Sequence, residues 1–194
     1  MQHYGAPTRL LDFTYSIYVA AYFALEKATN VAVDHAAIWS IDIKWAVRES
    51  KELLRKAGKT QVTPLPPLST EAEERTISDL IFDMNPVRMA WPVNPFRLNE
   101  RLMIQRGIFL VPGDIAVSHM DNLAALPGYD ENDRVLKIRL PRQIRREALR
   151  QLFHMNISHT SLFPGLDGYA HSLGIYHPTI IEPKWGSEEN SRPN

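Results

Sequence analysis

Residues 2–28 read QHYGAPTRLLDFTYSIYVAAYFALEKA, in which a polar loop runs into a long apolar segment. The loop is dense in turn-forming residues, and Gly5 and Pro7 indicate a shaped turn. Residues 8–13 then predict a short buried stretch. We therefore expect the chain to pass from a surface loop directly into the interior of the fold.

The apolar segment at residues 17–28 predicts a helix. Its apolar residues fall on nearly every side, which is typical of a helix buried in a core. Thr14 or Ser16 is placed to cap it, because a hydroxyl oxygen accepts a hydrogen bond from the free N–H groups of the first turn. We expect a capped helix packed inside the domain.

The rest of the chain shows short strand and helix patterns without regular alternation. Runs rich in β-branched and aromatic residues predict strands, and amphipathic runs with capping residues predict helices. We expect strands at residues 36–43, 87–91, 107–112 and 134–140, and helices at 45–57, 69–82, 97–106, 141–154 and 166–173. Residues 114–133 predict loop and turn. The fold class is therefore α+β, with a mixed sheet of short strands packed against helices.

The composition is that of an ordinary globular protein. Of the 194 residues, 44% are hydrophobic and 23% are charged. No apolar run has the length of a membrane span, and the N-terminus lacks the regions of a signal peptide. Cysteine is absent, which excludes disulfides, thiolate nucleophiles and zinc–cysteine sites. We expect a cytoplasmic protein with no membrane partner.

The charge balance argues against strong non-specific nucleic-acid binding by the whole chain, since 22 basic residues offset 22 acidic ones. A local exception lies between residues 137 and 150, where one acid, Glu147, stands among six basic residues. These are Lys137, Arg139, Arg142, Arg145, Arg146 and Arg150. The cluster is either a solvated helix face or a nucleic-acid contact, and both interpretations stay open.

Several kinds of site lack their sequence patterns. Neither G-x-G-x-x-G nor G-x-x-x-x-G-K-[ST] occurs, so the common phosphate-binding loops are not expected. No H-E-x-x-H pair and no G-x-S-x-G turn occurs either. We therefore expect no metal site and no Ser-His-Asp triad.

The N-terminal loop and the residues after it hold the densest group of polar side chains in the sequence. Arg9 and Asp12 flank an apolar pair, and an isolated charge that enters a core costs several kcal/mol unless it is paired. The two residues therefore form either a structural clamp or part of a binding site. In the second case Arg9 meets an anionic ligand group while Thr14 and Ser16 donate hydrogen bonds.

A second polar cluster follows the expected helix at residues 97–106. Helical spacing puts Arg101 and Gln105 on one face, and Gly107 permits a sharp turn from helix to strand. Gln105 is suited to bind an amide or a ribose hydroxyl, and equally to make a capping or strand-edge hydrogen bond. We predict that Gln105 lies at one cleft with Arg9 and Asp12.

Three segments resemble the motifs of FRG domains. Residues 2–14 resemble Q-H-Y-G-x-P-T-R-L-L-D-W-T, with Phe13 in place of the usual Trp, and an alanine–aromatic helix follows. The R-x-x-x-Q-x-G-x-F pattern at residues 101–109 resembles the second motif of the family. The sequence FPGLDG at residues 163–168 resembles its C-terminal signature.

The resemblance implies an FRG domain over residues 1–175 and a tail at residues 176–194. The aromatic-Arg-Gly motif that names the family stands upstream of this loop in FRG domains, and here Met1 directly precedes the loop. We therefore expect either a truncated domain or a true start upstream of Met1. On its own the chain should bind NAD weakly or not at all, and the upstream segment should restore binding.

A looser analogy links FRG domains to ADP-ribosyltransferases, whose cofactor is NAD. On this analogy the catalytic positions are Arg9, Asp12 and Gln105, and the cofactor contacts are His3, Tyr4, Thr14, Ser16 and Arg101. Glutamine cannot supply an ionised carboxylate, so Gln105 would orient a ribose hydroxyl. Bacterial FRG proteins are often associated with defence, which implies a transferase-like effector against phage. The alternative is a non-catalytic module that binds nucleic acid or protein.

Overall fold

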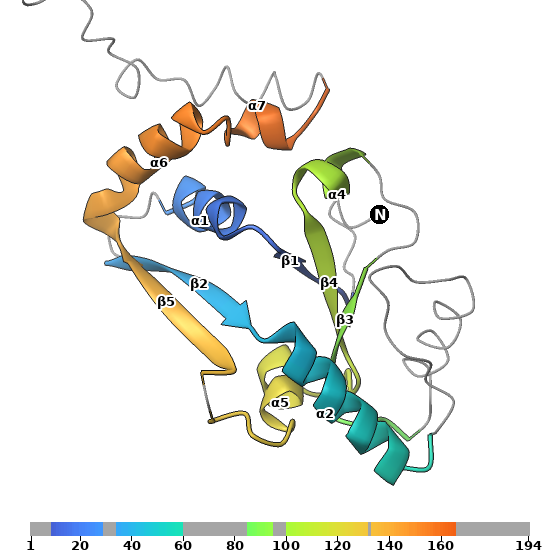
Figure 1. The fold of residues 1–194 in the computed structure, drawn as a ribbon. Coiled ribbons are helices and arrows are strands. Elements are labelled where there is room, and N and C mark those ends of the chain that lie inside the picture. Colours follow the sequence, from blue (N-terminus) through green and yellow to red (C-terminus); the bar gives the residue numbers. More distant parts are fainter. Residues whose placement is uncertain (1–8, 29–33, 60–84, 95–99, 132, 166–194) are drawn as a thin grey trace, which may run out of the picture.

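The computed structural model describes residues 9–28, 34–59, 85–94, 100–131 and 133–165, and its helices and short strands confirm the α+β class (Figure 1). The helices expected at residues 69–82 and 166–173 lie outside the described residues. None of the described helices combines the length and the apolar character that a membrane span requires. In chain order the elements are β1 (Leu11–Thr14), α1 (Ile17–Glu26), β2 (His35–Ile41), α2 (Ile43–Lys56), β3 (Ala90–Val93), α4 (Glu100–Ile104), β4 (Gly107–Pro112), α5 (His119–Ala124), β5 (Val135–Pro141), the 3-10 turn η2 (Arg142–Ile144), α6 (Arg145–His154) and α7 (His159–Leu162).

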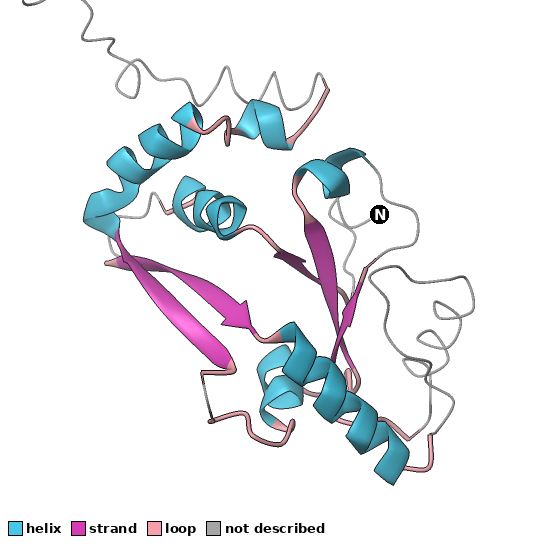
Figure 2. Ribbon diagram, viewed as in Figure 1, coloured by secondary structure: helices cyan, strands magenta, loops and turns pink. Residues whose placement is uncertain are grey.

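The described strands form two antiparallel sheets, where we expected one mixed sheet. One sheet has the order β1-β4-β3, and the other is a two-stranded ribbon of β2 and β5 (Figure 2). Pro92 lies within β3, and a proline has no N–H to donate to a further strand. This explains why β3 is an edge strand and why the three-stranded sheet ends there.

The main core lies between α2 and the three-stranded sheet. Trp45 and Leu54 of α2 are each 1% exposed and pack with Trp91 and Val111 of the sheet. Asp42 caps α2 by accepting a hydrogen bond from the backbone N–H of Trp45 at 3.1 Å. The indole N–H of Trp45 donates to the carbonyl of Pro127 at 2.8 Å, so a large buried aromatic keeps its polar group satisfied.

A second, smaller core joins α1 to α6 and α7. It consists of Val19 and Tyr22 of α1, Leu152 of α6 and Leu162 of α7, and each is at most 7% exposed. Ser16 caps α1, as we expected, by accepting from the backbone N–H of Val19. The helices α6 and α7 consequently lie beside α1 although they follow it by more than a hundred residues (Figure 1).

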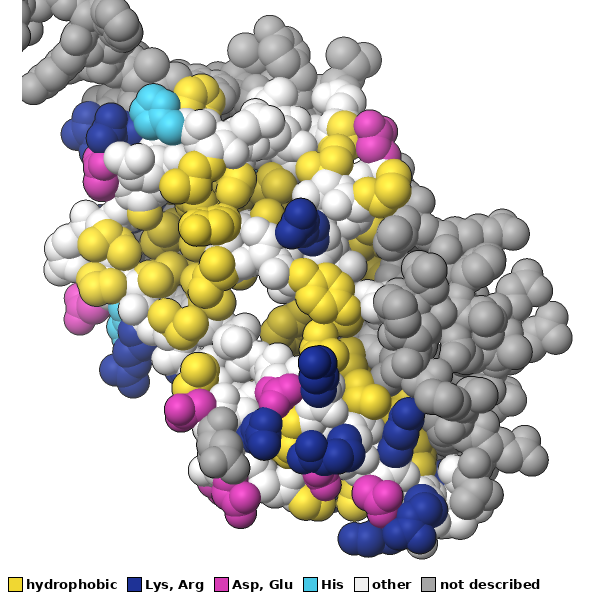
Figure 3. Space-filling view, viewed as in Figure 1, with side chains coloured by type: hydrophobic (Ala, Val, Ile, Leu, Met, Phe, Trp, Pro, Cys, Tyr) yellow, Lys and Arg dark blue, Asp and Glu magenta, His cyan; other side chains and the backbone are white. Residues whose placement is uncertain are grey.

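Three local expectations were wrong. The helix α1 is not buried all round: Val19, Tyr22 and Leu25 are buried, whereas Ile17 and Tyr18 are 53% and 54% exposed. Apolar side chains gathered over the region of α1 are visible in Figure 3. Leu11 is 41% exposed, although it lies on the same side of β1 as Phe13, which packs against the main core. Residues 114–133 contain the helix α5 in place of continuous loop.

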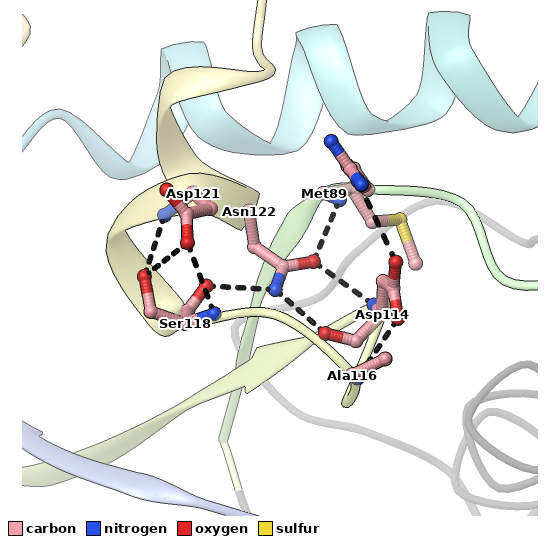
Figure 4. Close-up of polar contacts among 7 residues, drawn as sticks. Met89, Asp114, Ala116, Ser118, Asp121 and Asn122 are labelled. Atoms are coloured by element: carbon pink, nitrogen blue, oxygen red, sulfur yellow. Dashed lines mark hydrogen bonds and ion pairs between the residues drawn. The ribbon is translucent and has the colours of Figure 1, made fainter.

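Asn122 of α5 is a fully buried polar hub. Its side-chain oxygen accepts from the backbone N–H groups of Met89 and Asp114, and its amide donates to the carbonyls of Asp114 and Ser118 (Figure 4). A capping box between Ser118 and Asp121 starts the helix. The hydroxyl and backbone N–H of Ser118 hold the pKa of Asp121 below its usual value. The hub thus ties the loop after β4 to the segment before β3.

Candidate functional site

A groove of about 630 Å³ opens where the first turn of α1, the end of α4 and the connection between α6 and α7 meet. Its floor includes two buried apolar residues, Val19 and Leu162, and most of its remaining lining is polar. The lining residues are Ser16, Val19, Ile104, Arg106, Asn156, Ile157, Ser158, Thr160, Ser161 and Leu162. Three segments far apart in the sequence therefore build one concave surface.

Thr14 joins the N-terminal segment to the end of α4. Its hydroxyl donates to the backbone carbonyl of Gln105 at 2.7 Å and accepts from the backbone N–H of Ser16 at 3.0 Å. The backbone N–H of Tyr15 also donates to the carbonyl of Arg106 at 3.0 Å. These bonds extend the pairing of β1 with β4 beyond the strand ends and fix the start of α1 against α4.

Gln105 joins the end of α4 to α7. The side chain is 9% exposed, and its amide nitrogen donates to the backbone carbonyl of Leu162 at 2.9 Å. Gln105 is thus bonded to Thr14 through its backbone and to Leu162 through its side chain. Since the amide lies behind the groove and is not part of its lining, its observed role is to hold the walls together.

Arg101 and Phe163 make a further contact between the second and third segments. The guanidinium lies 4.2 Å from the centroid of the Phe163 ring, which is the geometry of a cation–π contact. Burial lowers the pKa of Arg101, and the negative charge of Asp12 acts in the opposite direction. The Nε of Arg101 is buried and has no hydrogen-bond partner within the described part of the chain.

A buried polar contact fastens α7 to α1. His159 Nδ1 lies 2.9 Å from a carboxylate oxygen of Glu26, and the hydroxyl of Tyr22 donates to the same oxygen at 2.8 Å. The His159 ring also stacks on Phe163, with centroids 4.2 Å apart and an interplanar angle of 14°. Arg145 of α6 donates to the carbonyls of Leu25 and Glu26 at the end of α1. The three helices that flank the groove are therefore held by charged and aromatic groups as well as by apolar packing.

Two non-glycine residues with left-handed backbone line the groove. Arg106 has φ of 49° and Asn156 has φ of 60°. Each follows the last turn of a helix, where a left-handed residue turns the chain away from the helix axis. Asparagine adopts this conformation readily, whereas arginine does so less often. The backbone at Arg106 is therefore held by the surrounding hydrogen bonds, including the one from Tyr15 to its carbonyl.

The polar lining suits an anionic group. Arg106 is an exposed cation at the rim of the groove, and Ser16, Ser158, Thr160 and Ser161 bring hydroxyls to the same surface. Guanidinium and hydroxyl groups are the usual protein donors to phosphate and carboxylate oxygens. The groove is also within the size range of small-molecule pockets, about 300–1,000 Å³.

The structure treats the residues singled out from the sequence in different ways. His3 and Tyr4 lie outside the described residues. Asp12 is an exposed residue of β1, and Arg9 is exposed just before that strand. Ser16 lines the groove, while Thr14 and Gln105 serve as connections behind it. A catalytic or ligand-binding role for any of these residues stays a prediction.

The sequence did not predict that Arg106 lines the groove, nor that the hydroxyl-bearing residues of α7 line it as well. A local signal was present at α7, because Ser158 and Ser161 are spaced as a capping pair and do form a capping box. No local signal places Thr160 or Arg106 beside Ser16, since that proximity depends on contacts between distant segments.

The fold and groove define an α+β domain in which three distant segments meet at one concave surface. A family model described as FRG domain matches residues 1–32, which is a small part of the chain. The resemblance to FRG domains is thus confirmed for the segment that contains β1 and α1. No curated protein and no solved structure matches the chain.

Proposed function

We propose that this chain is an FRG-type domain that binds a phosphate-bearing nucleotide in the groove, with NAD as the first candidate. The observation that carries the proposal is that residues of all three FRG-like segments contact one another directly behind the groove. Thr14 bonds to Gln105, Gln105 bonds to Leu162, and the Arg101 guanidinium lies over Phe163. These contacts between segments that resemble one family support a shared role in shaping the groove.

The chemistry of the lining supports a phosphate ligand. Arg106 offers a forked donor of fixed positive charge, and Thr160, an exposed residue of α7 that also lines the groove, offers a hydroxyl. The first turn of α1, capped by Ser16, adds the positive end of a ten-residue helix. Apolar residues such as Val19 and Ile157 give the ribose or base a surface to pack on.

The residues fit NAD binding better than they fit the transferase roles that the analogy suggests. NAD, when bound, would supply an ADP-ribosyl group that is released from nicotinamide. Gln105 is already bonded to Leu162 and Thr14 to Gln105, so neither is freely presented to a ligand in the groove. Nucleotide binding is therefore the core of the proposal, and ADP-ribosyl transfer in bacterial defence is its more specific form.

Titration calorimetry with NAD, ADP-ribose and AMP tests the binding proposal. Arg106→Gln should weaken binding by about 1.5–3 kcal/mol, the usual contribution of a hydrogen bond to a charged group. Arg48→Gln on α2 is the matched control, since it removes an exposed arginine far from the groove lining and should leave the affinity unchanged. The proposal is wrong if none of the three ligands binds, or if the two arginine variants bind equally well.

A separate assay tests transfer. The chain is incubated with NAD carrying a label on the adenylate part, and label on protein or nucleic acid is measured. If NAD binds but no label is transferred, the proposal of nucleotide binding stands and the proposal of ADP-ribosyl transfer is wrong. Transfer that survives Gln105→Leu in a folded variant would show that Gln105 has no part in the chemistry.

A further inference from the structure

The two-stranded ribbon of β2 and β5 has an exposed face that combines an aromatic ring with basic side chains. Trp39 pairs with Lys137 across the ribbon, and Ala37 pairs with Arg139 one step further along the same face. Trp39 is 40% exposed, whereas Ile38 on the opposite face is 7% exposed and belongs to the protein interior. The face of Trp39 is therefore open to solvent along the middle of the ribbon.

The charges on this face are of one sign. The Lys137 ammonium lies 5.2 Å from the centroid of the Trp39 ring, and the side chain of Arg139 has no hydrogen bond or ion pair within the described part of the chain. Neither strand contains an acidic residue. An aromatic surface thus stands beside two cations that no acidic residue of the ribbon itself neutralises.

The structure divides the six basic residues between 137 and 150 into different roles. Arg145 is engaged with the last carbonyls of α1, at 2.7 and 2.9 Å. Arg150 pairs with Glu147 at 2.8 Å, and its hydrogen bond, with one from Gln151, lowers the pKa of Glu147 to about 2. These two arginines are therefore committed to the protein, while Lys137 and Arg139 face outward.

A hollow at the end of the ribbon extends the basic surface. It has a volume of about 410 Å³ and is lined by Asp34 and by Arg142, Arg145 and Arg146, among others. The backbone N–H of Arg142 donates to the carbonyl of Asp34 at 2.9 Å, which fixes the hollow directly beyond the last pair of the ribbon, His35 and Pro141. A chain of phosphates that follows the ribbon would reach this hollow.

We propose that the face of Trp39, Lys137 and Arg139 binds single-stranded nucleic acid. A base stacks on the exposed part of the indole, and the two cations contact the neighbouring phosphates, which is the usual combination in sequence-tolerant single-strand binding. A paired duplex hides its base faces and offers nothing to stack on Trp39. The surface is separate from the groove near Ser16 and Arg106 and requires no nucleotide there.

Fluorescence anisotropy with labelled oligo-dT and oligo-U of about 15 nucleotides, and with a duplex of equal length, tests the proposal. Both single strands should bind more tightly than the duplex. Trp39→Ala should weaken single-strand binding about tenfold or more, as expected for the loss of one stacked base. Lys137→Gln with Arg139→Gln removes two phosphate contacts, so the loss of affinity between about 50 and 200 mM salt should be about sevenfold smaller than for wild type.

The control for charge is the double variant Arg55→Gln, Lys56→Gln at the exposed end of α2, which loses the same two charges away from the ribbon. It should bind as the wild type does. Circular dichroism checks that each variant is folded, which the exposure of the three substituted side chains favours. The proposal is overturned if the wild type binds no single strand at low salt, if Trp39→Ala binds like the wild type, or if the control weakens binding as much as the ribbon variant.

Discussion

Replacing Thr14 with valine separates a structural role of this hydroxyl from a ligand-binding one. The hydroxyl donates to the Gln105 carbonyl at 2.7 Å and accepts from the Ser16 N–H at 3.0 Å. Valine has nearly the same shape as threonine, so Thr14→Val removes both bonds without opening a cavity. Two backbone groups then lose their partner at a half-buried position.

The size of the effect follows from these two orphaned groups. An unsatisfied buried donor or acceptor costs about 1–3 kcal/mol, and partial burial favours the lower end for each. We expect the free energy of unfolding to fall by about 2–3 kcal/mol. For a chain of this length 1 kcal/mol corresponds to about 2–4 °C in Tm, so the fall should be about 4–12 °C.

Thr14→Ser is the matched variant, because it keeps the hydroxyl and loses one methyl group. Its loss of stability should stay below about 1 kcal/mol. Thermal and urea unfolding followed by circular dichroism measure both variants. If Thr14→Val has the same Tm as the wild type but loses nucleotide binding, the structural interpretation is refuted and Thr14 has a ligand-binding role.

Three further changes test the fold around the site. Asn122→Leu should lower the unfolding free energy by about 3 kcal/mol or more in urea titration, because three buried backbone groups of Met89 and Asp114 lose their side-chain partner. A loss under about 1 kcal/mol would contradict the role of Asn122 as a buried polar hub. Hydrogen bonds from the backbone N–H of Trp45 and from Arg134 lower the pKa of Asp42, so its stabilisation is present above about pH 3.9 and is lost as pH falls through the lower folded pKa. Asp42→Asn should remove that acid sensitivity in urea titrations from neutral to acidic pH, whereas Asp42→Ala should also lose about 1 kcal/mol of helix capping at neutral pH; equal stability of the two variants would contradict the capping role. Gly113→Ala should destabilise by about 1–3 kcal/mol, since the new Cβ would lie 2.1 Å from the carbonyl oxygen of Val87, and an unchanged Tm would contradict this packing.

Local sequence signals predicted those parts of the fold that depend on neighbouring residues. The cap at Ser16, the strand at residues 107–112 and the helix α2 follow from residues within a few positions of each element. The helix α5 was missed because its six residues are too few to show a period, although Ser118 and Asp121 carry a capping-box spacing.

Contacts across long separations were beyond sequence reasoning. Thr14 and Gln105 are 91 residues apart, and Gln105 and Leu162 are 57 apart. The resemblance to FRG domains grouped the segments at residues 2–14, 101–109 and 163–168, but it did not predict which of their atoms are in contact. The burial of α1 was overestimated for a related reason, since composition cannot show which apolar residues of a helix become buried and which, such as Ile17 and Tyr18, stay exposed.

The residues that hold the walls of the groove together differ from the residues whose side chains line it, and this difference bears on ligand specificity. Thr14, Gln105 and Phe163 hold β1, α4 and α7 together, and of these three residues Thr14 lies in the segment that the FRG family model matches. The groups that reach the groove surface, Arg106 and Thr160, stand next to those residues and are not themselves bonded into the walls by their side chains within the described part of the chain. The connecting residues therefore account for the shape of the groove, while under the proposed function Arg106 and Thr160 would select its ligand without holding the fold. On this reasoning Arg106→Gln should alter affinity with little change in Tm, and Thr14→Val should do the reverse.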